Sequence, residues 1–327
     1  MTEAIFRRNQ LVPQMVEYDR LGISWRPYIM YFHTPNFVSP VVNTDSFGFR
    51  LTPHGTKSVS PLNIGPDQIC NLVVGGSTAF GVGADTDNGT IAAHLSKTTG
   101  DVWLNFAGRA FSAFQEFSLF ASFQKHLSKI NRIVIISGFN NLYLAQRNLP
   151  FEMPLGSFFF QQAFESAMLK SGRRSAIRSL LRRPIADHQS TSRTMTSAIE
   201  LAVESTRHSL ELWRALALAK GAKLVFALQP TAVWSERRES SQEKELFEFL
   251  SAIDHNLAGT LRRLDLTCYQ SYRQALLAMT QELQISFLDL NDHMRSLRDD
   301  ADWHYVDRVH YTSIGYQRVA EAVTSGL

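Results

Sequence analysis

Five short apolar runs, separated by longer segments with helical patterning, most strongly constrain how this 327-residue chain can fold. The runs are residues 69–76, 101–108, 132–139, 222–230 and 285–292. Each is rich in Val, Ile, Leu or Phe with little polar alternation, which is typical of strands that are covered on both faces. Strands alternating with helices predict a doubly wound, parallel α/β sandwich. In such folds, ligands bind at the carboxyl ends of the strands.

Two regions fall outside this alternation. Residues 1–67 hold seven of the eleven prolines, which predicts an irregular segment that wraps a main domain of residues 68–327. Residues 145–190 form an insertion after the third predicted strand. Four phenylalanines in it are spaced to bury one side of a short helix, and these are Phe158, Phe159, Phe160 and Phe164. We expect that helix to dock as a lid over the carboxyl edge of the sheet.

The insertion also carries a basic stretch at residues 170–183. It includes Arg174 and Arg178, and no acidic residue occurs between Glu165 and Asp187. Such a stretch is either a solvated helix face or a surface that receives an anion.

Composition narrows the function classes. Lys and Arg total 33 against 30 for Asp and Glu, and a net charge of +3 does not indicate nucleic-acid binding. The two cysteines, Cys70 and Cys268, cannot build a disulfide framework and lack metal-site spacing. The first twenty residues lack the apolar core of a signal peptide, and no apolar run reaches the length of about 18 residues that a membrane span needs. We therefore expect a soluble, cytoplasmic protein.

The first predicted strand ends in a glycine-rich turn, "NLVVGGSTAFGVG" at residues 71–83. A phosphate-binding loop of the Walker type would need Lys after its closing glycine, but Gly81 is followed by Val82. The glycines also do not fit the dinucleotide-binding fingerprint. Two interpretations of Ser77 remain: an ordinary helix cap, or a nucleophile exposed at a strand-to-helix turn.

Polar residues at other strand ends supply what a nucleophilic serine needs. Asp307 and His310 stand three residues apart before the last helical segment, as an orienting carboxylate and a general base would. Asn140 follows the third strand and could donate to an oxyanion. Alternatives stay open: Asn140 could be a turn residue and Asp307 a helix cap. Asp302 and His304 lie close enough to be mistaken for the pair.

Four blocks in this order resemble the SGNH hydrolases, the GDSL-type esterase and acyl hydrolase superfamily, in its branch with "GGST" at the nucleophile. The blocks are "GGST" at 75–78, "NFAGRAFSAFQE" at 105–116, "GFNN" at 138–141 and "DRVH" at 307–310. The resemblance implies a three-layer α/β/α fold of flavodoxin-like type. Its five-stranded parallel sheet would have the order 2-1-3-4-5, with the helical insertion shaping the mouth of the site.

The resemblance also implies roles for individual residues. Ser77 resembles the nucleophile, and its backbone N–H resembles the first oxyanion donor. His310 resembles the general base, Asp307 the carboxylate that orients it, and Asn140 the side-chain oxyanion donor. In the second block, the position of the usual oxyanion glycine falls on Ala110, while the nearest glycine is Gly108. A backbone amide does not require glycine, so we favour Ala110 and keep Gly108 as the alternative.

The activity implied is serine-dependent hydrolysis of short acyl esters, such as O-acetyl groups on a sugar or secondary metabolite, through an acyl-enzyme. The substrate would be a small-molecule ester, and no metal or organic cofactor is implied. One alternative is an O-acyltransferase whose anionic acyl donor, coenzyme A or a carrier protein, is received by Arg174 and Arg178. Another is a catalytically silent binding module of the same fold. Gly76 and Asn141 replace aspartates that are frequent in the family, and neither position performs a step in this mechanism.

Overall fold

Five parallel strands form the central sheet. The computed structural model describes residues 3–127, 129–147, 157–161, 163, 164, 166, 193–253, 255–297 and 302–327. The strands are β5 (Ile69–Gly75), β6 (Trp103–Ala107), β7 (Lys129–Ser137), β8 (Lys223–Leu228) and β9 (Ser286–Asp289). Their order in the sheet is β6-β5-β7-β8-β9, with every neighbouring pair parallel. This order confirms the predicted 2-1-3-4-5 arrangement of the five apolar runs.

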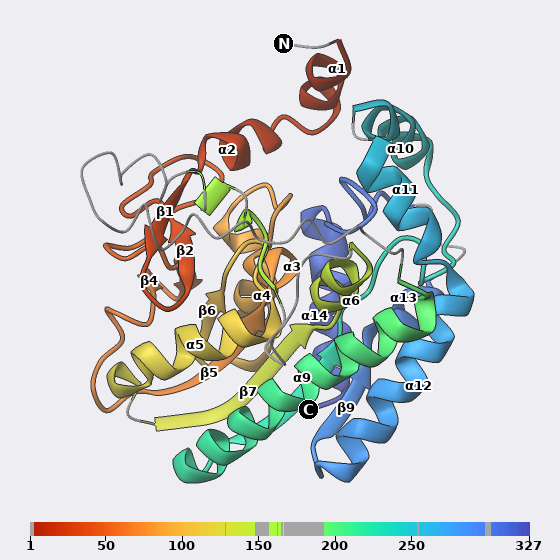
Figure 1. Ribbon diagram of the computed structural model, residues 1–327. Helices are drawn as coiled ribbons and strands as arrows, with labels where there is room; N and C mark the ends of the chain where they lie inside the picture. Colours follow the sequence, from red (N-terminus) through yellow and green to blue (C-terminus); the bar gives the residue numbers. More distant parts are fainter. Residues whose placement is uncertain are drawn as a thin grey trace, which may run out of the picture.

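Helices cover both faces of the sheet, as the lack of polar alternation in the strands requires. One face is covered by α5 (Ala113–Phe123), α9 (Met195–Lys220) and α12 (Leu266–Glu282), which lie in front of the sheet in Figure 1. The other face is covered by α4 (Ile91–Thr99), α13 (Leu290–Ser296) and α14 (Ser313–Ser325). The three-layer α/β/α prediction is therefore confirmed.

Two short helices begin where central strands end. They are α3 (Ser77–Phe80), which follows β5, and α6 (Phe139–Gln146), which follows β7. The turn into α3 needs Gly75, whose φ is +151° and whose Cα faces the carbonyl oxygen of Ile136 so closely that a Cβ would collide with it. Gly138 makes the equivalent turn into α6 with φ +104°. Both helices start at the carboxyl edge of the sheet (Figure 1).

The N-terminal 67 residues are more regular than their proline content predicts. They contain helices α1 (Glu3–Leu11) and α2 (Met15–Arg20), the antiparallel hairpin β1 (Ile23–Arg26) with β2 (Met30–His33), and the hairpin β3 (Thr52–His54) with β4 (Lys57–Val59). The expectation of an irregular segment is wrong for these residues. Pro13 separates the two helices and Pro27 lies in the first hairpin turn, so these prolines mark the ends of elements.

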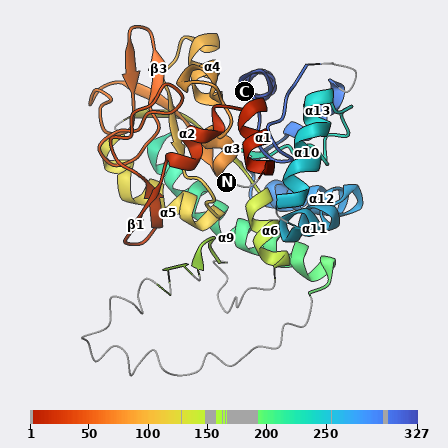
Figure 2. The same ribbon diagram turned by 90° about the horizontal axis from the view of Figure 1, so that it is seen from above.

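The remaining helices lie beside the main sandwich. They are α10 (Ser241–Ile253), α11 (His255–Arg263) and two 3₁₀ turns at Asp87–Gly89 and Gln124–His126. Figure 2 shows α1 beside α10, where the Arg7 guanidinium carbon lies 5.2 Å from the centroid of the Phe249 ring. Across the described ranges, no helix combines the length and apolar character that crossing a membrane requires.

Candidate active site

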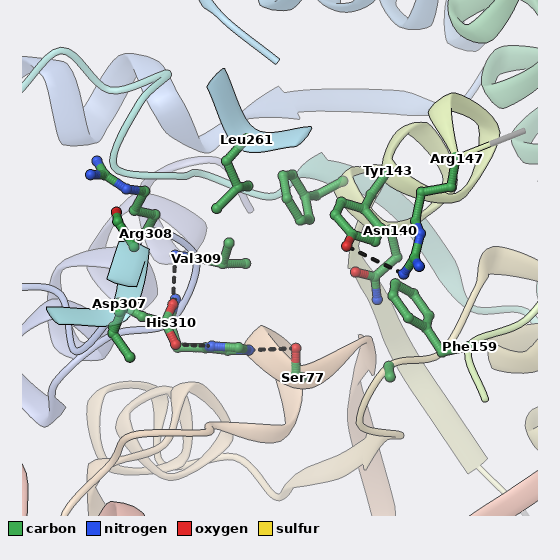
Figure 3. Close-up of a pocket in the computed structure, with 14 residues that line it drawn as sticks. Ser77, Asn140, Tyr143, Arg147, Phe159, Leu261, Asp307, Arg308, Val309 and His310 are labelled. Atoms are coloured by element: carbon green, nitrogen blue, oxygen red, sulfur yellow. Dashed lines mark hydrogen bonds and ion pairs between the residues drawn. The ribbon is translucent and has the colours of Figure 1, made fainter. Parts of the chain in front are cut away.

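Ser77, His310 and Asp307 form one hydrogen-bonded chain (Figure 3). Ser77 is the first residue of α3, and its Oγ lies 2.7 Å from Nε2 of His310. Nδ1 of His310 lies 2.6 Å from Oδ2 of Asp307. The two distances are those of a serine bonded to a base and of a base bonded to an orienting acid.

A short loop ahead of α14 holds Asp307 in place. Oδ1 of Asp307 accepts the backbone N–H groups of Val309 at 2.7 Å and of His310 at 2.8 Å. Thr78 in α3 donates its hydroxyl to the Val309 carbonyl at 3.3 Å, which links this loop to the serine turn. The helix itself is capped by Thr312, whose hydroxyl accepts from the N–H of Gly315, so Asp307 is not the cap of α14.

The charge state of Asp307 fixes the tautomer of His310. Burial raises the pKa of the Asp307 carboxyl, but His310 and the two backbone N–H groups lower it more, so the pKa lies below its usual value. The carboxylate is therefore ionised and accepts the proton on Nδ1 of His310. Nε2 is then left to accept from the Ser77 hydroxyl.

The nearby pair of Asp302 and His304 does not form this site. The His304 side chain is fully buried, while that of Asp302 is half-exposed with Oδ2 3.7 Å from Nη2 of Arg318. Neither residue lines the cavity that Ser77 faces. The structure brings Asp307 and His310 to the serine, and not Asp302 and His304.

Asn140 lies across the cavity from His310. It is the second residue of α6, and its Nδ2 donates to the Phe111 carbonyl at 2.8 Å. The side chain packs on the backbone of Gly76, where a Cβ would come within 2.7 Å of Nδ2. The Asn140 amide is therefore fixed beside the turn that carries Ser77.

Ala110 and Gly108 differ in what their backbone can offer. The N–H of Gly108 donates to the Gly75 carbonyl at 3.1 Å, and Gly108 does not line the cavity. Ala110 lines the cavity with φ +58°, and within the described residues its N–H has no hydrogen-bond partner. Of the two residues, only Ala110 lines the cavity and has an amide without a hydrogen-bond partner among the described residues.

Asn141, the residue after Asn140, joins three elements. Its Oδ1 accepts the N–H of Ala113 at the start of α5 at 3.0 Å. Its Nδ2 donates to the hydroxyl of Thr206 in α9 at 2.8 Å. Asn141 is thus a packing residue behind Asn140.

The cavity above Ser77 has a volume of about 430 Å³ and mostly apolar walls. Its larger apolar lining residues are Phe139, Tyr143, Phe159, Leu250, Leu261 and Val309. Phe159 stacks on Tyr143 with ring centroids 5.5 Å apart and an interplanar angle of 15°. Such walls exclude water and accommodate small apolar groups.

The phenylalanines of the insertion do not share one helix face as predicted. Phe159 lines the cavity, but Phe160 has φ +64°, is 48% exposed and contacts Tyr31 instead. A residue with positive φ breaks the helical repeat, so neighbouring rings point in different directions. Arg174 and Arg178 lie outside the described residues.

Arg147 is a cavity residue that sequence reasoning missed. It follows α6 and lies seven positions after Asn140, so Asn140, Tyr143 and Arg147 fall on one helix face. Its Nη1 lies 3.5 Å from the Tyr143 hydroxyl, and its guanidinium carbon lies 5.7 Å from the centroid of that ring. Figure 3 shows Arg147 reaching between Tyr143 and Phe159. The i, i+3, i+7 spacing was the signal that could have found it.

Arg308, the second arginine of the lining, is held elsewhere. Its guanidinium carbon lies 4.7 Å from the centroid of the Phe247 ring, and its Nη1 lies 4.0 Å from Oε1 of Glu239. In Figure 3 it points away from Ser77. Where the structure describes the chain, no group of three His, Cys, Asp or Glu side chains could hold a metal ion.

No known family model matches the chain, and no curated protein matches it. Three solved structures illustrate the likenesses found. A member of the lipolytic protein G-D-S-L family from Veillonella parvula DSM 2008 is 14% identical, covering 79% of this chain and 96% of that one, with TM-score 0.43. A GDSL-like lipase from Bacteroides thetaiotaomicron VPI-5482 is 12% identical, covering 80% and 87%, with TM-score 0.39. An acetylxylan esterase from Geobacillus stearothermophilus is 13% identical, covering 80% and 95%, with TM-score 0.39.

The first two of these proteins bear the GDSL name of the superfamily that the sequence motifs resemble. Because the identities and TM-scores are low, the chemistry of this chain rests on the geometry of its own residues.

Proposed function

We propose that this protein is a serine esterase that hydrolyses short acyl esters of small molecules. The observation that carries the proposal is the hydrogen-bonded chain from Asp307 through His310 to Ser77, which opens onto an apolar cavity. A serine with both a base and an orienting carboxylate within hydrogen-bond distance is the arrangement that acyl transfer needs.

In the first half of the proposed reaction, Oγ of Ser77 attacks the carbonyl carbon of the ester while Nε2 of His310 takes the hydroxyl proton. The carbonyl π bond breaks and leaves the negative charge on oxygen. The N–H groups of Ser77 and Ala110 and the side-chain amide of Asn140 are the donors for that oxygen. Collapse of the tetrahedral intermediate breaks the ester C–O bond, and His310 protonates the departing alkoxide.

In the second half, a water molecule loses its proton to His310 and attacks the acyl-enzyme. A second tetrahedral intermediate forms, with its charge at the same donors. Its collapse releases the carboxylic acid and returns the proton to Oγ of Ser77. No further group is needed to balance the reaction, because each proton that His310 takes is given back.

The cavity supports a small substrate with an apolar portion. Its volume of about 430 Å³ and its aromatic and aliphatic walls suit a short acyl chain or a compact alcohol, such as an O-acetylated sugar derivative or secondary metabolite.

Acyl transfer to a hydroxyl other than water is the second candidate function. Arg147 favours it, because a cation beside the apolar wall of the cavity would receive an anionic donor such as coenzyme A or an acyl carrier. The chemistry at Ser77 would be the same, with an acceptor alcohol in place of water. Products formed with and without added alcohols would separate the two functions.

Labelling with a fluorophosphonate tests the proposed nucleophile. We expect one covalent adduct on Ser77, hydrolysis of p-nitrophenyl acetate, and loss of both in Ser77→Ala. Ser112→Ala is the matched control, because Ser112 also lies at the start of a helix, α5, but does not line the cavity that Ser77 faces. A folded wild-type protein that neither reacts nor hydrolyses esters would instead be the silent binding module.

A further inference from the structure

We propose that His33 and Tyr31 are positioning residues, which hold the turn at residues 108–111 so that the Ala110 amide faces the developing oxyanion. We call this turn the oxyanion loop. The proposal rests on the proposed function, because it assigns a role to residues that support one of the oxyanion donors. Residues of the N-terminal segment thus contribute to catalysis by positioning an oxyanion donor.

Both ring nitrogens of His33 form hydrogen bonds. It ends β2, its side chain is 1% exposed, and its Nδ1 lies 2.9 Å from the Gly48 carbonyl oxygen. Its Nε2 lies 3.0 Å from the backbone nitrogen of Arg109. A carbonyl can only accept and an amide N–H can only donate, so the proton is on Nδ1 and Nε2 accepts. The neutral ring thereby fixes the Gly108–Arg109 peptide, one residue before the Ala110 amide.

The surroundings of His33 keep it neutral. Burial lowers the pKa of the His33 imidazole well below its usual value, and the cations Arg109 and Arg50 lower it further. The hydrogen bond to Gly48 acts in the opposite direction and does not offset them. A protonated ring could not accept from Arg109, so the neutral state is the one that supports the loop.

Tyr31 contacts the oxyanion loop on the carboxyl side of Ala110. Its hydroxyl donates to the Ala110 carbonyl oxygen at 2.6 Å. Ala110 has φ +58°, a left-handed conformation that is unfavourable for a residue with a Cβ. Contacts on the N–H of Arg109 and the carbonyl of Ala110 together hold this conformation, which sets the direction of the Ala110 N–H.

The side chain of Arg109 returns to the same N-terminal segment. Its guanidinium donates to the carbonyl oxygen of Tyr18 at 2.9 Å and also to that of Leu21. Burial lowers the pKa of Arg109 to about 10, so the group stays charged at neutral pH. The N-terminal segment thus holds the oxyanion loop by contacts with its backbone and with the side chain of Arg109.

Arg50 makes a separate attachment to the serine turn. It is fully buried, and its Nη1 donates to the carbonyl oxygens of Phe80 and Gly81 at 3.1 and 2.9 Å, at the end of α3. Its Nε lies 2.8 Å from Oδ1 of Asp87. One segment therefore contacts both the helix that begins with Ser77 and the loop that carries Ala110.

Substitutions at His33 and Tyr31 test the positioning role. His33→Met removes the acceptor for the Arg109 N–H at similar volume, whereas His33→Gln keeps an acceptor on a side chain of similar reach. We expect kcat of His33→Met for p-nitrophenyl acetate to fall about 10–100-fold, the scale of a small misplacement in an active site, with KM nearly unchanged. His33→Gln should recover part of that loss.

Tyr31→Phe removes one hydroxyl and keeps the ring, so it serves if His33→Met does not fold. We expect its kcat to fall roughly 3–10-fold, the effect of losing one hydrogen bond. Thr52→Val is the matched control, because Thr52 is buried in the same segment and its hydroxyl has no partner among the described residues. All rates would be measured well below the melting temperature of each variant.

Two results would overturn the proposal. Wild-type kcat in a folded His33→Met, or in Tyr31→Phe if the former fails to fold, would remove His33 and Tyr31 from the mechanism. An equal loss in Thr52→Val would mean that the segment acts only through general stability. Either result leaves the esterase proposal intact if activity still depends on Ser77, whereas activity that survives Ser77→Ala would end the esterase proposal itself.

Discussion

Asn140 and Gly76 fit together so closely that a methyl group on residue 76 would lie 2.7 Å from Nδ2 of the asparagine. Asn140 cannot simply turn aside, because the same nitrogen is bonded to the Phe111 carbonyl. The glycine in "GGST" and the asparagine in "GFNN" are therefore a matched pair. Gly76 has φ −83°, which any residue can adopt, so the constraint comes from Asn140 alone.

Gly76→Ala tests this relationship. The added Cβ should displace the Asn140 amide and lower kcat for a short p-nitrophenyl ester by about 10²–10³-fold, as loss of an oxyanion donor does. Asn140→Ala should lower kcat to a similar level. In the double variant we expect no further loss, because both changes remove the same donor. Fully additive losses would contradict this interpretation.

Substitutions in the hydrogen-bonded chain should separate the three roles. Ser77→Ala and His310→Ala should each abolish ester hydrolysis and leave the circular dichroism spectrum unchanged. Asp307→Asn should lower kcat by about 10²–10⁴-fold, because Ser77 and His310 remain while the tautomer of His310 is no longer enforced. A fully active Ser77→Ala would show that another nucleophile performs the reaction.

Arg147 should affect the binding of negatively charged esters and not the rate at which Ser77 reacts. Arg147→Met should raise KM for an ester that carries a carboxylate or phosphate, with little effect on p-nitrophenyl acetate. The difference should shrink as salt rises, since charges separated by more than about 8–10 Å are screened at physiological ionic strength. Arg308→Met is the control, because its guanidinium points away from Ser77 (Figure 3). Equal effects on charged and neutral esters would remove the support for an anionic acyl donor.

Glu116 should make stability depend on pH. Its carboxyl is buried, Oε1 accepts from the Ser137 hydroxyl at 2.8 Å, and Oε2 has no partner among the described residues. Burial raises its pKa to about 8, against a hydrogen bond from Ser137 that lowers it. Between pH 4.5 and 8 the unfolded chain releases a proton that the folded chain keeps, so stability falls as pH rises.

Glu116→Gln removes that dependence, because an amide does not titrate. The unfolding free energy of the variant minus that of the wild type should therefore increase by about 1.4 kcal/mol for each pH unit in this window. Urea unfolding at pH 5 and pH 8 measures the gain, and comparing variants cancels contributions from buried histidines such as His33. Glu211→Gln, on the exposed face of α9, should show no such trend. Parallel curves for Glu116→Gln and the wild type would mean that Glu116 is ionised in the fold.

The sheet and the placement of Ser77 and His310 could be predicted because their signals are local. A continuous apolar run identifies a buried strand, and a serine at its end is already at the edge where ligands bind. The spacing of Asp307 and His310 is likewise contained in one short loop. These features need no knowledge of how distant segments meet.

The contacts that the N-terminal segment makes with the active site leave no such local pattern in the sequence. His33 bonds a backbone nitrogen 76 residues away, and a contact from a side chain to a backbone places no demand on the partner's residue type. The prolines suggested irregularity, although two of them only separate regular elements. A buried Arg50 in a segment of loops and hairpins gives no sequence signal of its burial, because arginine is usually exposed.

The hydrogen bond between Ser77 and His310 joins residues 233 positions apart. Contacts of this kind form late when a chain refolds, because a long loop must close before the bond can form. Helices such as α9 involve only neighbouring residues and can appear earlier. During refolding from urea, a brief fluorophosphonate pulse would label only molecules in which this loop has closed, while far-ultraviolet circular dichroism follows the helices. The reactive serine is thus a built-in reporter of when the two distant parts of the chain meet.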